Sequence, residues 1–265
     1  MRLRLVLLCA ASLVLSACGG TKLVRNAPPA PQPDRPLASA SDANLSAGLE
    51  FVIVRNGPGA WAKNGDWDEY LVQLRNVSTL PVQIRSLRLT DYRDQASEPL
   101  ADRRQLVRAS KQVTRRYRDA GVAVQPGRGG AGLVAAGVGA GVVGYGAAVA
   151  ATTSAALGAG GTAGGGAAAA AGGLFLAAPV LVGIGIVRMV NNGKVDDRIH
   201  SRASTLPVDL APGAELRLDV FFPVTPSPQR LAIAYTDSQG EHQLELDTRQ
   251  ALHGLHLVAP DAPAP

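Results

Sequence analysis

Few residues of this chain combine the types and spacing that catalysis or metal binding requires. His253 and His256 are separated by two residues and would face one way on a helix, a spacing that suits a metal ion. No acidic residue or cysteine lies close to them in the sequence, so exposed local polarity is the better interpretation. Asp196 and Asp197 are adjacent, and adjacent side chains of a helix do not converge, which favours a solvated face. The sequence therefore predicts no metal site.

The glycine-rich part of the chain does not carry a nucleotide-binding pattern. The chain has 30 glycines, but no Lys-Ser or Lys-Thr pair follows a P-loop spacing, and the strand–helix context of a dinucleotide site is missing. The sequence also contains no nucleophile elbow and no recognisable catalytic triad. We therefore expect a protein that is not an enzyme and that needs no cofactor.

The two cysteines, Cys9 and Cys18, are too few for a multi-bridge disulfide scaffold or a four-cysteine zinc site. Both lie close to the amino terminus, in a stretch that reads as a secretory leader. Residues 1–4 are basic, and residues 5–15 form an apolar run that is too short to span a bilayer as a permanent helix. Small residues follow and lead directly to the second cysteine.

The end of this leader resembles the lipobox of bacterial lipoproteins through Leu15-Ser16-Ala17-Cys18. The resemblance implies a signal peptide over residues 1–17, a diacylglyceryl thioether on the sulfur of Cys18, and an acyl chain such as palmitate on its new amino group. Several acyl chains give stable anchoring, whereas one gives only marginal binding. Gly19 follows the cysteine in place of aspartate, which for such lipoproteins implies a periplasm-facing position on the outer membrane. The alternative is an ordinary secretory signal with a chance cysteine.

Residues 18–44 are predicted to form the lipidated amino terminus and a proline-rich tether. Hardly any large apolar side chain accompanies its prolines, which are Pro28, Pro29, Pro31, Pro33 and Pro36. Such a composition favours extended polyproline II structure and cannot bury a core. At about 3.1 Å per residue, an extended tether of this length would reach roughly 80 Å.

The globular part of the chain is predicted to be mainly β. Seven short runs have strand character, at residues 49–55, 69–77, 80–92, 203–210, 215–224, 230–236 and 242–246. Seven short strands with turns between them fit an immunoglobulin-like β-sandwich and resemble small periplasmic sandwich domains. Neither group of strands buries more than one face alone, so residues 45–97 and 203–250 must pair across the intervening chain. Residues 251–265 are expected to be a tail.

An amphipathic basic helix is predicted over residues 98–121. It would begin at Ser97-Glu98-Pro99 and end at Gly121, with apolar residues on one face. Its polar face carries the candidate basic surface, formed by Arg104, Arg108, Lys111, Arg115 and Arg116. The whole chain has a net charge of +5, and removal of the leader leaves 24 basic residues against 21 acidic ones, so much of the excess lies on this helix. Anionic lipid headgroups are the expected partner of this surface, and nucleic acid is not. An equal alternative to a binding role is a solvated helix that only covers the edge of a sheet.

Residues 129–187 contain no charged residue, and residues 129–190 are predicted to form a hairpin of two Gly/Ala-rich helices. The small residues recur with glycine-zipper spacing, which allows close helix packing. The candidate membrane-contact residues are Gly137, Gly141, Gly144, Leu174, Phe175, Leu181 and Ile184. A membrane-associated hairpin is favoured over a zipper packed on protein, in this chain or in an oligomer, and over a flexible loop.

Together these patterns predict a lipid-anchored envelope protein with a structural or interaction role. The apolar hairpin would supply a second membrane contact. The competing hypothesis is a membrane-active or pore-forming component, in which hairpins from several copies assemble. The protein partner, whether a second copy or another envelope protein, is left open.

Overall fold

The computed structural model describes residues 21–27, 29, 33–128 and 192–258. Cys18, the expected signal peptide, the predicted apolar hairpin with all seven of its candidate residues, and residues 259–265 lie outside the described part. Within that part the chain is mainly β, as predicted, with antiparallel sheets and two helices. No described helix has the length and apolarity that crossing a membrane requires.

The strands are β1 (Lys22–Leu23), β2 (Ala38–Ser41), β3 (Leu45–Ile53), β4 (Ala62–Lys63), β5 (Trp67–Asn76), β6 (Val82–Thr90), β7 (Ala96–Ser97), β8 (Val208–Leu210), β9 (Glu215–Pro223), β10 (Arg230–Asp237) and β11 (Gly240–Asp247). Helix α2 spans Arg103–Asp119, and a second helix covers residues 192–202. Each of the seven predicted runs overlaps one strand, although the boundaries differ by up to about five residues.

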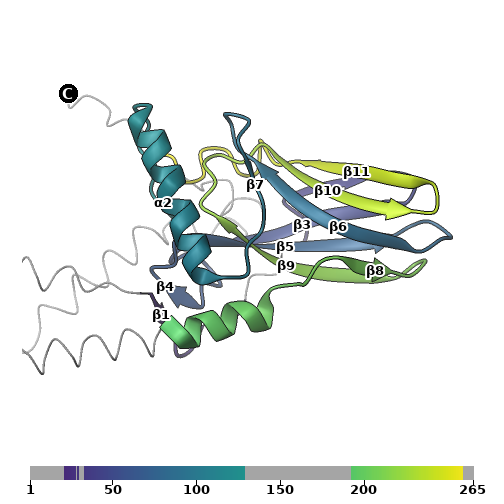
Figure 1. Ribbon diagram of the computed structural model, residues 1–265, viewed down its shortest axis with the longest axis horizontal. Coiled ribbons are helices and arrows are strands. Elements are labelled where there is room, and N and C mark those ends of the chain that lie inside the picture. Colours follow the sequence, from purple (N-terminus) through teal and green to yellow (C-terminus); the bar gives the residue numbers. More distant parts are fainter. Residues whose placement is uncertain (1–20, 28, 30–32, 129–191, 259–265) are drawn as a thin grey trace, which may run out of the picture.

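Two larger sheets face each other (Figure 1). One has the order β2-β3-β5-β9, and the other has the order β11-β10-β6-β7 with β8 also paired to β6. A separate small sheet consists of β1 and β4. The strands before and after residues 129–191 therefore interleave, because β9 pairs with β5 and β10 pairs with β6. The expectation that residues 45–97 and 203–250 pair across the intervening chain is confirmed.

The two larger sheets share one apolar core. Alternate residues of each strand point inward, as the pleat requires. Buried side chains of β3, β5 and β9 meet those of β6, β10 and β11 in a single cluster. Tyr70 of β5 and Phe222 of β9 pack edge to face with ring centroids 5.2 Å apart, a favoured aromatic geometry.

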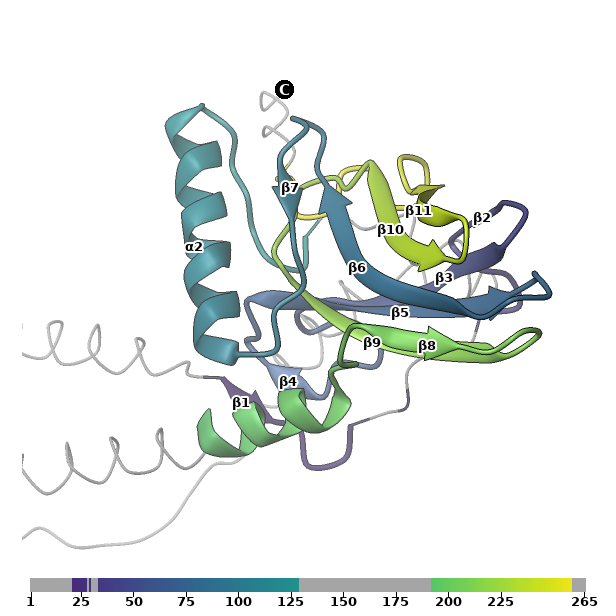
Figure 2. The same ribbon diagram turned by 45° about the vertical axis from the view of Figure 1, so that its right-hand side comes forward.

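The two ends of the paired sheets differ. At the end that we call proximal, β5 begins at Trp67 beside Pro223, the last residue of β9. Helix α2, the helix over residues 192–202 and the β1–β4 sheet all lie at this end (Figures 1 and 2). At the opposite, distal end only short turns join the strands, among them residues 42–44 and 238–239.

The amino-terminal stretch differs from the expected free tether. Leu23 pairs with Ala62 in the β1–β4 sheet, and β2 adds an edge strand to β3. The N–H of Leu37 donates to the carbonyl of Leu49 at 2.7 Å. These are backbone hydrogen bonds, which need no large side chain and therefore leave no hydrophobic pattern in the sequence.

Helix α2 begins later than predicted. The side chain of Asp102 accepts the N–H of Gln105 at 2.7 Å and caps the helix, so the helix starts at Arg103 and not at residue 98. The N–H of Leu100 donates to the carbonyl of Phe221 in β9. This hydrogen bond holds the residues just before α2 against the sheet. The predicted stop is confirmed: Gly121 has φ +76°, a conformation that favours glycine.

Two further segments differ from the sequence-based expectations. Residues 192–202, for which no element was expected, form a helix that buries Val195 and Ile199. The predicted strand over residues 203–210 is reduced to β8. Residues 251–258 were assigned to the tail, but they pack on the domain and bury Leu252 and Leu255.

Candidate functional site

Helix α2 is fixed to the proximal end by its inner face. The buried residues Leu106, Ser110, Val113 and Tyr117 follow helical spacing. The Oγ of Ser110 accepts the N–H of Val224 at 2.9 Å, directly after β9, and donates to the carbonyl of Asp66 just before β5. The hydroxyl of Tyr117 donates to the buried carboxylate of Asp91 at 2.5 Å. Burial is the main cause that raises the pKa of the Tyr117 hydroxyl well above the ordinary value, and the contact with Asp91 is the second. The helix therefore has a fixed rotation about its axis.

The outer face of α2 carries a line of exposed cations. Five basic residues recur at intervals of three and four, namely Arg104, Arg108, Lys111, Arg115 and Arg118. At about 100° per residue they fall within an arc of about 80°, opposite the buried face. We call this group the basic stripe. The structure thus places four of the five predicted basic-surface residues in one row.

Most of the basic stripe has no neutralising partner. Arg118 lies 3.7 Å from the carboxylate of Asp119, and both side chains are exposed. Within the described part of the chain, no carboxylate forms an ion pair with the other four cations of the stripe. The fifth predicted residue, Arg116, lies off the stripe and donates to the side-chain oxygen of Gln95 at 3.0 Å. The stripe is therefore a concentrated positive surface that is available to an anionic partner.

A buried carboxylate holds the chain where it returns from residues 129–191. Arg202, at the end of the helix over residues 192–202, donates to Oε1 of Glu69 through its Nε atom at 2.7 Å. The indole N–H of Trp61 donates to the other oxygen of Glu69 at 2.6 Å. Burial raises the pKa of Glu69, and the neighbouring Arg202 offsets part of that rise. Near the middle of the same helix, Asp196 forms an ion pair at 2.8 Å with Arg103 of α2.

The neighbouring carboxylate holds the chain where it leaves for residues 129–191. Nε2 of His256 lies 2.6 Å from Oδ2 of Asp68, and both side chains are essentially inaccessible to solvent. The N–H of Gly127 donates to Nδ1 of His256 at 3.0 Å, so Nε2 carries the proton that is donated to Asp68. Gly127 has φ +76°, and a Cβ there would lie 2.4 Å from the carbonyl oxygen of Arg55. This contact requires glycine.

The expected interpretation of the histidine pair was wrong for one of its members. His253 is exposed, but His256 is fully buried against a strand about 190 positions earlier in the chain. The two rings do not share an environment. The described residues contain no group of three or more side chains suited to hold a metal ion. Nothing near His256 in the sequence indicates Asp68, so spacing alone could not find this contact.

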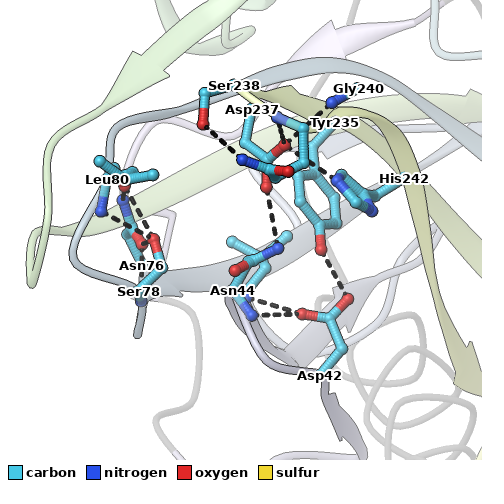
Figure 3. A network of polar contacts seen from close by, with 12 residues as sticks. Asp42, Asn44, Asn76, Ser78, Leu80, Tyr235, Asp237, Ser238, Gly240 and His242 are labelled. Carbon is cyan, nitrogen blue, oxygen red and sulfur yellow. Dashed lines mark hydrogen bonds and ion pairs between the residues drawn. The ribbon is translucent and has the colours of Figure 1, made fainter.

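A separate polar network joins the two sheets at the distal end (Figure 3). Tyr235 donates to Asp42 at 2.8 Å, and Asn44 donates to Asp237 at 2.9 Å. The ring of His242 stacks on that of Tyr235 and lies 2.9 Å from the carboxylate of Asp237. Both carboxylates also accept backbone N–H groups of their own turns. The network is saturated with internal contacts, which is typical of a structural joint.

Comparison of the chain with protein-family models, with curated proteins and with solved structures finds no match.

Proposed function

We propose that this protein is a lipid-anchored envelope protein with a structural or interaction role, and that its domain is an immunoglobulin-like sandwich. Counting the seven strands expected from the sequence, the first, second and fifth form one sheet, and the seventh, sixth, third and fourth form the other. A fourth strand that joins the sheet of the third is a variation within this architecture. The basic helix and residues 129–191 lie between the third and fourth strands.

The observation that carries the proposal is the basic stripe. Each Lys or Arg close to an anionic leaflet contributes about 1 kcal/mol of binding free energy, so five would contribute about 5 kcal/mol. That amount corresponds to weak binding, which suits a protein that is held at the surface by another means. A lipidated Cys18 supplies such an anchor, and the charge-free run of residues 129–187 offers a further contact with lipid.

The anchor is tested by mass spectrometry of the mature amino terminus. We expect a chain that begins at Cys18 with a diacylglyceryl group and an amide-linked acyl chain. In the Cys18→Ser variant the precursor should retain its leader, and no lipid should be attached. An unmodified Cys18, or a mature chain that begins elsewhere, would remove the lipoprotein proposal.

The role of residues 129–190 is tested by dye release from vesicles. A protein that uses this segment only as a second contact should bind vesicles without releasing their contents. Release that rises with protein concentration would instead favour the pore-forming alternative, in which several copies assemble.

A further inference from the structure

We propose that the proximal end of the domain lies directly against an anionic membrane surface, held there by the pairing of β1 with β4. This inference rests on the proposed lipid anchor at Cys18. The sequence alone predicts a domain on a long, free tether, whereas the β1–β4 pairing gives a domain that is docked in a fixed orientation. The partner is the anionic leaflet that receives the acyl chains.

The first observation is that the chain joins the domain almost at once after the anchor. Lys22 pairs with Lys63 and Leu23 with Ala62 in the β1–β4 sheet, and the N–H of Val24 donates to the carbonyl of Trp61 at 2.8 Å. Four residue steps separate Cys18 from Lys22. At about 3.5 Å per step they span at most about 14 Å. The β1–β4 sheet must therefore remain close to the lipid headgroups.

The second observation is the chemistry of this sheet. Lys22 and Lys63 are cross-strand partners and both are exposed, an arrangement of like charges that is destabilising unless an anionic partner is present. Leu23, beside them, is one of the few large apolar residues that remain exposed in the described chain. A layer of lipid phosphates with apolar chains beneath it matches both features.

The third observation is that the other membrane-directed parts of the chain lie at the same end. Helix α2 lies across the proximal end (Figure 2). Its buried face is turned toward the sheets, because Ser110 bonds to Asp66 and Val224, so the basic stripe points away from them. The chain is held where it leaves for residues 129–191 by Asp68, and where it returns by Glu69, which is the next residue of β5. Figures 1 and 2 both show the beginning of the helix over residues 192–202 beside β1.

The orientation is tested with the full, lipidated protein in vesicles that contain anionic phospholipid and a nitroxide-labelled headgroup lipid. Single cysteines are introduced by Lys63→Cys at the proximal end and by Ser238→Cys in the distal turn, both at exposed positions, and each carries a fluorophore. The ten residues of β5 at about 3.4 Å each separate the two ends by about 34 Å. We expect the label at position 63 to lose most of its emission and the label at position 238 to keep it.

A second variant isolates the β1–β4 pairing. A flexible Gly/Ser insertion of about 20 residues between Gly20 and Thr21 would give the anchor a free reach of about 25 Å. We expect quenching at position 63 to persist at high salt with the native connection, and to become salt-sensitive with the insertion.

The outcomes separate the two proposals. Labelled protein that fails to float with the vesicles would contradict the proposed anchor. Protein that floats but shows equal quenching at positions 63 and 238, or the same salt response with and without the insertion, would overturn the docked orientation alone.

Discussion

At the scale of single residues, the most consequential contact is the buried one between His256 and Asp68. Replacing His256 by Ala would remove its contacts with Asp68 and Gly127 and leave a buried carboxylate without its partner. Leaving a buried hydrogen-bonding group without its partner costs about 1–3 kcal/mol, and more when the group is a carboxylate. We expect a loss of this size in the free energy of unfolding, measured by urea denaturation.

His253 provides the matched control, because it is exposed and lies only three positions away. The His253→Ala variant should unfold within about 0.5 kcal/mol of the wild type, as is usual for surface substitutions. Equal free energies of unfolding for the two variants would mean that the contact between His256 and Asp68 does not stabilise the fold.

The distal network predicts an acid-sensitive joint. Burial raises the pKa of Asp42. This rise is outweighed by the hydrogen bonds that its carboxylate accepts from the N–H groups of Leu45 and Asn44 and from the hydroxyl of Tyr235, so the pKa lies below the ordinary value. The pKa of Asp237 is also lowered, for similar reasons. A lowered folded pKa contributes stability that is complete above the unfolded pKa of about 3.9 and is lost as the pH falls through the folded value.

The Asp42→Asn variant should therefore melt at a lower temperature than the wild type at neutral pH. The difference between the two melting temperatures should shrink as the pH falls below about 4. Thermal melts across a pH series measure this difference. A gap that stays constant down to pH 2 would show that ionisation of Asp42 does not stabilise the joint.

At the scale of elements, the sequence predicts those parts whose signals are local. The seven strands follow from alternation of apolar residues, and the end of α2 follows from Gly121. The helix over residues 192–202 is missed because only Val195 and Ile199 mark its buried face. Strands β1 and β2 are missed because backbone pairing with distant segments, and not side-chain pattern, defines them.

The candidate site divides in the same way. The exposed cations of α2 could be predicted, because helical spacing alone brings Arg104, Arg108 and Arg115 to one face. The two carboxylate contacts could not be predicted, since Asp68 and Glu69 each bind a residue more than 130 positions away. Nothing in the sequence around either partner indicates the other.

The inserted segment yields a prediction at this scale. A short flexible linker in place of residues 129–191 should leave a folded domain, because β5, β6, β9 and β10 pair without it. Changing loop length alters the closure entropy only slowly, by about 0.6 kcal/mol for each doubling. Circular dichroism should show β structure and a cooperative melt. Loss of both would place residues 129–191 in the core of the fold.

At the scale of the whole molecule, the two ends of the domain are built differently. Turns and a saturated polar network close the distal end. The proximal end gathers the basic stripe, the β1–β4 sheet and both connections to residues 129–191. We propose that this end binds an anionic membrane through the cations of α2.

Vesicle flotation across a salt series tests that claim most directly. The protein is the mature chain with Cys18→Ser, produced without its leader, so that no lipid anchor contributes. One variant changes Arg104, Arg108 and Arg115 to Gln. The control changes three other exposed arginines, Arg75, Arg85 and Arg88, to Gln and alters the net charge equally.

We expect the α2 variant to bind anionic vesicles about 100-fold more weakly at low salt, which corresponds to about 3 kcal/mol for three cations near the leaflet. The control variant should bind almost as well as the parent protein. The difference should narrow as salt rises, because exposed charges are screened over about 10 Å at 0.1 M. Equal weakening of the two variants, or a parent protein that stays in solution at every salt concentration, would contradict membrane binding through α2.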